Sequence, residues 1–136
     1  MEVNVQHLGD SRFEVCARGH RVICDQPREN GGSDSGMTPP EFLLASLGTC
    51  AGYYAAEYLK TRGLPAGDLH VRVLAEKAPN PARIGSFRIE IFAPGLDERH
   101  RTGVSRAAKS CLVHNTLLHT PEVEIAVETE VLNPAA

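Results

Sequence analysis

The feature that most constrains the fold of this chain is one long helix with apolar residues on almost every side. Thr38 is a typical N-cap residue, Pro39 and Pro40 suit a first helical turn, and Glu41 completes a capping-box pattern. Gly63 predicts the C-terminal end. The apolar side chains between these ends are Phe42, Leu43, Leu44, Ala45, Leu47, Ala51, Tyr53, Tyr54, Ala55, Ala56 and Tyr58.

A helix that is apolar on all sides is expected to be buried on all sides. The chain has 136 residues, which is the ordinary size of one domain and predicts a single domain over 1–136. One domain of this size has difficulty in surrounding so long a helix. We therefore expect a second copy of the chain to complete the burial.

Short alternating segments precede this helix. Apolar pairs stand at Val3 and Val5, at Phe13 and Val15, and at Val22 and Ile23. They are separated by the turn-forming residues 9–10 and 18–20, and this pattern predicts two or three antiparallel strands. The polar, glycine-rich residues 26–37 are predicted to form a loop.

A long hairpin is predicted after the helix. Its strands are the alternating segments 70–76 and 87–92, which are joined by residues 78–85, rich in proline, glycine and asparagine. A second helix is expected from about Asp97 to Ser110, because acidic residues begin it and a lysine ends it.

The C-terminal part is predicted to hold a short helix over 112–118 and a last strand, with apolar residues at Val123, Ile125, Val127 and Val131. The complete order is then β-β-β-α-β-β-α-α-β. Strands and helices are clustered in this order and do not alternate strictly, which indicates the α+β class.

Charge and hydropathy exclude two kinds of partner. The formal net charge is −3 and the basic residues are scattered, so no nucleic acid partner is expected. No apolar run approaches the roughly 18–20 residues of a membrane span, so no membrane is expected either. The N-terminus lacks the basic start and apolar stretch of a signal peptide, which predicts a cytoplasmic location.

In a reducing compartment, cysteines are more often buried, catalytic or metal-binding than paired in structural disulfides. The four cysteines show no C-x-x-C spacing and the histidines no H-x-x-x-H pair, so neither a metal nor another cofactor is expected. Cys16 and Cys24 fall on the N-terminal hairpin. If it turns at residues 18–19, position 16 faces 21 and position 24 faces 13, so a disulfide is not expected and both are interpreted as packing residues.

Cys50 lies in the middle of the apolar helix between Gly48 and Gly52. Each glycine in a helix interior costs about 1 kcal/mol relative to alanine, which indicates that something approaches the helix closely there. Two interpretations stay open. Cys50 is either a buried and inert free thiol beside a tightly packed neighbour, or a reactive sulfur.

Cys111 lies at the start of the short helix 112–118. The helix dipole and free N–H groups at such a place favour a thiolate, so we expect a lowered pKa for Cys111. His114, three residues further on, is on the same face and would assist. In the alternative, Cys111 is a small core residue and His114 a capping or surface residue.

A peroxide reductase needs few parts. It needs a thiolate to attack the O–O bond, and a fixed cation, usually arginine, to hold the thiolate and the leaving oxygen. It also needs a second thiol that closes a disulfide before over-oxidation. This chain has thiols, arginines and an apolar helix, but many inert proteins have them too.

The stretch from Gly36 to Cys50, which contains Thr38-Pro39-Pro40-Glu41 and ends in Leu47-Gly48-Thr49-Cys50, resembles the first-cysteine helix of the OsmC/Ohr family. This family contains osmotically inducible protein C and the organic hydroperoxide resistance proteins. The stretch Cys111-Leu112-Val113-His114-Asn115-Thr116-Leu117 is similar to its second-cysteine motif. The resemblance covers nearly the whole chain and is closest to the broad OsmC-like branch.

The resemblance implies an α+β fold and an intertwined homodimer, in which two central helices are surrounded by sheets from both chains. It also implies a thiol peroxidase that reduces organic hydroperoxides or hydrogen peroxide. Cys50 would be the peroxidatic residue, pass through a sulfenic acid and form a disulfide with Cys111. An external dithiol would then reduce this disulfide.

The resemblance further implies an arginine from an early strand and a glutamate at the start of the cysteine helix. Arg12 is the best match for the arginine, with Arg18 and Arg21 as alternatives, and Glu41 matches the glutamate while also suiting its capping role. Two other functions stay open. The chain is either a non-catalytic dimer that binds a small apolar ligand, or a redox sensor that forms the disulfide without turnover.

Overall fold

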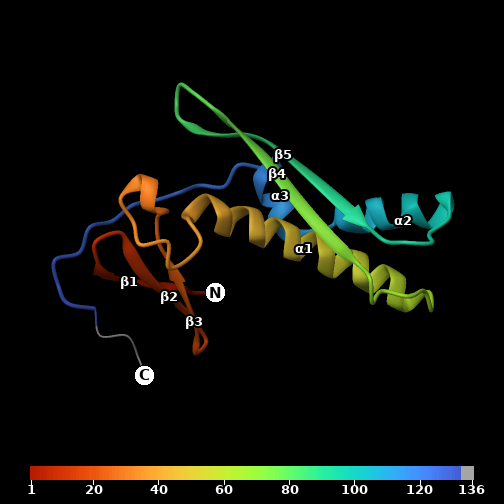
Figure 1. Ribbon diagram of the computed structural model, residues 1–136, viewed down its shortest axis with the longest axis horizontal. Helices are drawn as coiled ribbons and strands as arrows, with labels where there is room; N and C mark the ends of the chain where they lie inside the picture. Colours follow the sequence, from red (N-terminus) through yellow and green to blue (C-terminus); the bar gives the residue numbers. More distant parts are fainter. Residues whose placement is uncertain (133–136) are drawn as a thin grey trace. The chain divides into compact units, whose positions relative to one another are not determined.

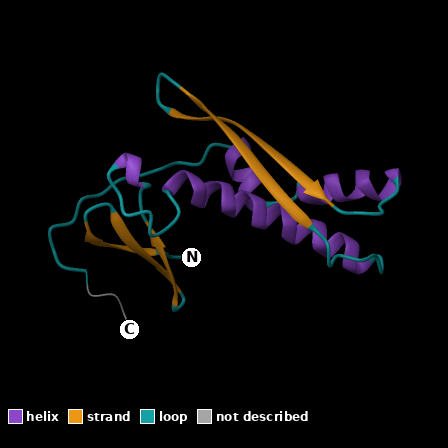
Figure 2. Ribbon diagram, viewed as in Figure 1, coloured by secondary structure: helices purple, strands orange, loops and turns teal. Residues whose placement is uncertain are grey.

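The computed structural model describes residues 1–132. These residues form two compact units, one made of Met1–Phe42 with the C-terminal residues from Glu122 onward, the other of Leu43–Pro121. Three α-helices and two antiparallel sheets occur in the described residues (Figures 1 and 2). The predicted α+β class is confirmed, and the first eight elements follow the predicted order.

The first unit contains a three-stranded antiparallel sheet of β1 (Asn4–Gly9), β2 (Arg12–Ala17) and β3 (His20–Cys24). In the register of β2 and β3, Cys16 faces Arg21 and Cys24 faces Phe13, as the turn at residues 18–19 predicts. Because neighbouring residues of a strand point to opposite faces, this register puts Cys16 and Cys24 on different sides of the sheet. Both carry free thiols.

The loop that follows β3 is organised around the fully buried side chain of Asp25. It contains a short 3₁₀ helix, η1 (Arg28–Asn30), and returns so that Met37 forms a parallel bridge with Cys24. The carboxylate of Asp25 accepts five hydrogen bonds, from the hydroxyls of Ser11 and Ser35 and from the N–H groups of Gln26, Ser33 and Ser35.

The long helix α1 (Pro39–Thr61) begins and ends where the sequence predicts. The Glu41 N–H donates to Thr38 Oγ1 over 3.4 Å, and the Thr38 hydroxyl donates to the Glu41 carboxylate over 2.9 Å. At the other end, Gly63 has a φ of 65°. The Gly63 N–H donates to the Lys60 carbonyl and the Leu64 N–H to the Leu59 carbonyl, which is the Schellman pattern of a helix end.

The second unit packs α1 from Leu43 onward against a long hairpin of β4 (His70–Ala78) and β5 (Arg83–Phe92), as Figure 1 shows. The strands are longer than predicted, because part of the expected loop 78–85 pairs as strand. The helix α2 (Glu98–Ala108) is capped by Asp97, and α3 (Leu112–Leu118) follows. The core cluster of this unit is made of Ala55, Leu59 and Val104.

Within the chain, α1 is buried along one side only. The buried residues form a stripe at helical spacing: Leu47, Gly48, Ala51, Ala55 and Leu59. Tyr53, which lies on another side, is 62% exposed. The described chain therefore does not supply the burial on all sides that the sequence predicts.

The predicted last strand is wrong for the single chain. Residues 119–132 form neither helix nor strand. The alternating residues Val123, Ile125 and Val127 are 81%, 87% and 87% exposed. A strand needs a neighbour to accept and donate its main-chain hydrogen bonds, and within residues 1–132 this segment pairs with none.

Among the helices of residues 1–132, none has the length and apolar character needed to cross a membrane.

Candidate thiol site

In the middle of α1, the glycines two residues before and two residues after Cys50 lie against β4. A Cβ atom on Gly48 would lie 2.9 Å from Val73 Cγ2, and one on Gly52 would lie 3.3 Å from Val71 Cγ2. The close approach predicted from the two glycines is therefore confirmed, and the approaching element is a strand of the same chain. Cys50 itself, between these glycines, is half-buried.

Cys111 comes close to Cys50 from the turn between α2 and α3. Its backbone is extended, with φ −57° and ψ 128°, and it is the N-cap of α3. The side chain is fully buried, and its sulfur accepts a hydrogen bond from the His114 N–H over 3.3 Å. Cys111 is also a neighbour of Cys50, 61 positions earlier in the sequence, because each thiol shifts the pKa of the other.

The thiol of Cys111 and the main-chain N–H groups of Val113 and Leu112 lie close enough to the sulfur of Cys50 to lower its pKa. Donors of this kind stabilise a thiolate more than a neutral thiol.

The two thiols are shifted in opposite directions. Burial raises the pKa of Cys50, but the hydrogen bonds from Cys111, Val113 and Leu112 outweigh it, so the pKa is lowered overall. Burial and the hydrogen bond to Cys50 raise the pKa of Cys111 against the weaker effects of the His114 and Val113 N–H groups. Cys50 is therefore the sulfur that ionises first.

This corrects the expectation that the start of the short helix lowers the pKa of Cys111. An N-cap side chain turns back to accept only from the N–H of the second or third helical residue. Cys111 does so with His114. The N–H groups of Leu112 and Val113 lower the pKa of Cys50, and that of Val113 acts on Cys111 as well.

His114 is half-buried, and its main-chain N–H is the group that serves Cys111. The ring atom Nδ1 is buried and has no hydrogen-bond partner within residues 1–132. The expected help of His114 to Cys111 is thus found in the main chain.

The other predicted site residues belong to the first unit. Arg12 on β2 is half-buried, and its Nε is buried with no hydrogen-bond partner among the described residues. Arg18 is exposed in a turn, and Arg21 forms an ion pair of 2.6 Å with Glu14. Glu41 is exposed and contacts Thr38. That Arg12 and Glu41 act at Cys50 stays a prediction.

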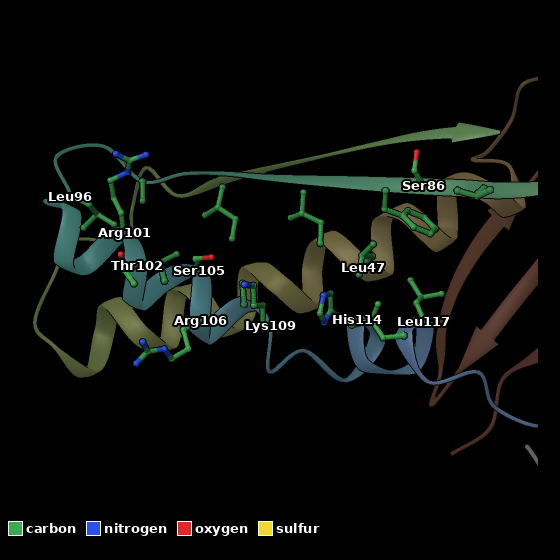
Figure 3. A pocket seen from close by; sticks show the side chains of 18 of the residues that line it. Leu47, Ser86, Leu96, Arg101, Thr102, Ser105, Arg106, Lys109, His114 and Leu117 are labelled. Carbon is green, nitrogen blue, oxygen red and sulfur yellow. The ribbon is translucent and has the colours of Figure 1, made fainter. Parts of the chain in front are cut away.

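An open groove of about 1160 Å³ lies in the second unit between β5 and the helices α2 and α3 (Figure 3). Leu47, His114 and Leu117 line one part of it, and Leu96 and Arg101 line another. Its lining is largely apolar, with basic residues from α2 and the residue after it: Arg101, Arg106 and Lys109. The sequence did not reveal this groove, because its walls come from three separate segments.

Residues 1–132 contain no group of three or more histidine, cysteine or acidic side chains placed to hold a metal ion.

Comparison with known proteins gives the class. The family model of the OsmC-like proteins matches residues 32–126, and the chain belongs to this family. The fold is similar to a Psychrobacter arcticus 273-4 protein named for osmotic stress and detoxification, at 22% identity and TM-score 0.77 over 84% of this chain and 85% of that one. An OsmC-like protein from Mycoplasma pneumoniae is 20% identical, with TM-score 0.72 over 88% and 87% of the two chains.

An organic hydroperoxide resistance protein from Elizabethkingia anophelis also shares the fold, at 14% identity and TM-score 0.65 over 88% of this chain and 90% of that one. No curated protein sequence matches this chain significantly. At these identities the solved structures establish the fold, and the activity has to be argued from the site.

Proposed function

We propose that this chain is a thiol-dependent peroxidase that reduces organic hydroperoxides and, as a second substrate, hydrogen peroxide. The proposal is carried by the contact between Cys50 and Cys111, whose pKa values are lowered and raised respectively. Such an enzyme needs this asymmetry, because one sulfur attacks as a thiolate while the other stays protonated until a sulfenic acid has formed. Solved relatives named for hydroperoxide resistance support the same class.

In the proposed cycle, the Cys50 thiolate attacks the distal oxygen of the hydroperoxide and the O–O bond breaks. The sulfur is oxidised to a sulfenic acid, and the alkoxide takes a proton from solvent and leaves as an alcohol. The sulfur of Cys111 then attacks the sulfenic sulfur, so that a disulfide forms and water leaves. An external dithiol reduces the disulfide by exchange, and two electrons have passed from the dithiol to the peroxide. Such a cycle suits the cytoplasm, the predicted compartment.

Arg12 and Glu41 complete the proposed site. Arg12 would supply the cation that holds the thiolate and the leaving oxygen, and Glu41 would orient its guanidinium. The buried Nε of Arg12, which has no partner among the described residues, supports this role because it leaves a donor free for another acceptor.

The working form is proposed to be an intertwined homodimer. Three features support it: α1 is covered on one side only, the groove is open, and the C-terminal segment exposes Val123, Ile125 and Val127. In a sheet with strands from both chains, this segment gains the neighbour that it lacks here. Its other side carries Glu122, Glu124, Glu128 and Glu130, as expected for a half-buried strand.

Sedimentation of the purified protein tests the dimer. Ile125→Lys should shift the equilibrium toward monomer, because it puts a charge on the apolar side of the segment. Glu124→Gln, which changes the polar side, is the matched control and should sediment as the parent does. A monomeric parent protein at micromolar concentration would contradict the dimer.

The enzymatic proposal is tested by hydroperoxide consumption. Purified protein should consume cumene hydroperoxide in the presence of dithiothreitol, and Cys50→Ser should abolish this. Cys111→Ser should permit one turnover and then accumulate sulfinic acid at Cys50, which mass spectrometry detects. Cys16 is a half-buried thiol on β2, so Cys16→Ser is the matched control and should keep the parent rate of hydroperoxide consumption.

The groove favours one second candidate, a protein that binds a small apolar ligand and uses no thiol chemistry. It predicts a ligand that co-purifies with the protein and no consumption of cumene hydroperoxide. A redox sensor would instead form the Cys50–Cys111 disulfide once and show no turnover with the dithiol present.

A further inference from the structure

The helix α2 forms one wall of the groove in the second unit. Thr102 and Ser105 line the groove from this helix, and Figure 3 shows both side chains. Leu47, three residues before Cys50 on α1, and His114, in the first turn of α3, line another part of it. The groove therefore adjoins the helical turn that carries the proposed attacking sulfur and continues along α2.

Between the two groove residues of α2, Gly103 faces the long helix α1. A Cβ atom at this position would overlap the hydroxyl and the ring of Tyr58, so only glycine leaves room for this side chain against α2. Tyr58 also packs against the core cluster of the unit. The two helices therefore approach each other here with the phenol ring directly on the main chain of α2.

The hydroxyl of Tyr58 reaches past Gly103 to the preceding turn of α2. It is hydrogen-bonded to Nδ1 of His100 over 3.1 Å, and the two rings are in edge contact with 6.0 Å between their centroids. The main chain of His100 is itself fixed, because its N–H donates to the N-cap Asp97 over 2.9 Å. The guanidinium carbon of Arg62 lies 3.7 Å from the centroid of the Tyr58 ring. Core packing and this cation hold the ring on α1, and the hydroxyl joins it to α2.

We propose that Tyr58 is a positioning residue, whose bond to His100 fixes α2 as the wall of a groove that takes the organic part of a bulky hydroperoxide. The lining of the groove is largely apolar, which suits an aromatic or branched hydrocarbon group. Hydrogen peroxide has no such group, so its reduction does not depend on this wall. The inference rests on the proposed function, and it names the part of the chain that selects between the two kinds of peroxide.

Tyr58→Phe tests the inference, because it keeps the ring and removes only the hydroxyl. Without the bond, α2 is in a loosened position for part of the time, and a ligand that fits only the held position binds more weakly by that fraction. We expect KM for cumene hydroperoxide to rise roughly 3–5-fold, the effect of one neutral hydrogen bond, with kcat unchanged. Both constants for hydrogen peroxide should stay at the parent values. An unchanged KM for cumene hydroperoxide, or an equal rise for both peroxides, would overturn the inference.

Two further variants show whether the bond itself is responsible. Tyr53→Phe makes the same change at a tyrosine of α1 that is 62% exposed, and it should keep the parent values. His100→Ala breaks the bond from α2, so alone and combined with Tyr58→Phe it should raise KM for cumene hydroperoxide by the same factor as Tyr58→Phe. A combined factor equal to the product of the two single factors would overturn the inference, because the two side chains would then act separately.

A binding measurement tests the positioning role without turnover. The probe is 2-phenyl-2-propanol, the alcohol that cumene hydroperoxide leaves on reduction, and its binding is followed by the ¹H–¹⁵N signals of the protein. It should shift the signals of Thr102 and Ser105, and its Kd should be roughly 3–5-fold higher in Tyr58→Phe than in the parent. Unshifted signals at both residues, or an equal Kd in the two proteins, would overturn the inference.

The inference and the proposed function fail separately. A parent protein that consumes no cumene hydroperoxide but binds the alcohol more tightly than Tyr58→Phe does lacks the proposed activity and keeps the positioning role. A parent protein that consumes both peroxides, with KM values that Tyr58→Phe leaves unchanged, has the proposed activity and lacks the positioning role.

Discussion

Asp25 in the first unit and Cys50 in the second are both acceptors that gather donors from the chain around them. Asp25 accepts five hydrogen bonds, two from hydroxyls and three from N–H groups. One thiol and two N–H groups lower the pKa of Cys50. The carboxylate is fully buried, whereas Cys50 is half-buried.

Hydrogen-bond donors have different consequences around Asp25 and around Cys50, because a carboxyl group and a thiol have different ordinary pKa values. The hydroxyl of Ser11 and the donors of Ser35 hold the pKa of Asp25 well below its usual range, so this group stays charged at any ordinary pH and can only organise the loop. A thiol starts near 8.5, so the lowered pKa of Cys50 moves toward neutral pH, where ionisation controls reactivity. Donors around a carboxylate fix a structure, and donors around a thiol set a reactivity.

Removing the carboxylate should give the largest effect. Asp25→Ala leaves the donors from Ser11, Gln26, Ser33 and Ser35 without their acceptor, and buried donors without partners are strongly destabilising. We expect Tm to fall by roughly 5–10 °C in thermal unfolding followed by circular dichroism. Glu29→Ala, an exposed residue of η1, is the control and should keep the parent Tm.

The pH dependence of this stability has a definite sign. The pKa of Asp25 is lowered by folding, so the stabilisation is present above the unfolded value of about 3.9 and is lost progressively as the pH falls below it. Asp25→Asn should be less stable than the parent at pH 7, and this difference should shrink on acidification. A stability difference that stays constant from pH 7 to pH 3 would contradict this prediction, because it would mean that folding does not lower the pKa of Asp25.

The second prediction concerns the order in which the two thiols react. The pKa of Cys50 is lowered and that of Cys111 is raised, so between pH 6 and 8 the first should be alkylated by iodoacetamide at least ~10-fold faster. Peptide mapping after timed alkylation measures both rates. Cys111→Ala removes the S–H donor and should raise the midpoint of Cys50 alkylation. Equal alkylation rates for the two cysteines would contradict this prediction, because the donors around Cys50 would then not control its reactivity.

The sequence predicts what depends on neighbours along the chain. Thr38 and Gly63 mark the ends of α1 through local chemistry, and the turn at residues 18–19 sets the register of Cys16 with Arg21. It does not predict the place of Asp25, because the donors come from Ser11 and from residues 26–35, which share no periodic pattern.

Two failures have the same physical origin. The last strand was expected from the alternation at Val123, Ile125 and Val127, but alternation shows only that a segment suits a sheet, and within residues 1–132 no strand pairs with it. The helix containing Cys111 predicts a lowered pKa for this residue, although N–H groups there also act on Cys50 from another segment, and burial and Cys50 raise the pKa of Cys111. In both cases, the local sequence pattern does not reveal which distant segment of the chain lies beside the residue.

The smallest effect is expected from replacing a glycine that lies close to a neighbouring segment. In the loop, a Cβ on Gly36 would overlap the main-chain carbonyl of Ile23, which cannot move without unfolding the loop. On α1, two residues after Cys50, a Cβ on Gly52 would lie 3.3 Å from a methyl group of Val71, a side chain that can shift slightly.

Gly52→Ala also gains about 1 kcal/mol of helix propensity, so we expect its free energy of unfolding to stay within ~1 kcal/mol of the parent in urea titration. Gly48→Ala is the matched variant and should lose about 1 kcal/mol, since its Cβ would lie only 2.9 Å from Val73 Cγ2. The alkylation midpoint of Cys50 should be the same in Gly52→Ala as in the parent, because no donor to the sulfur changes. A raised midpoint in this variant would mean that the packing of β4, and not the N–H groups of α3, sets the ionisation of Cys50.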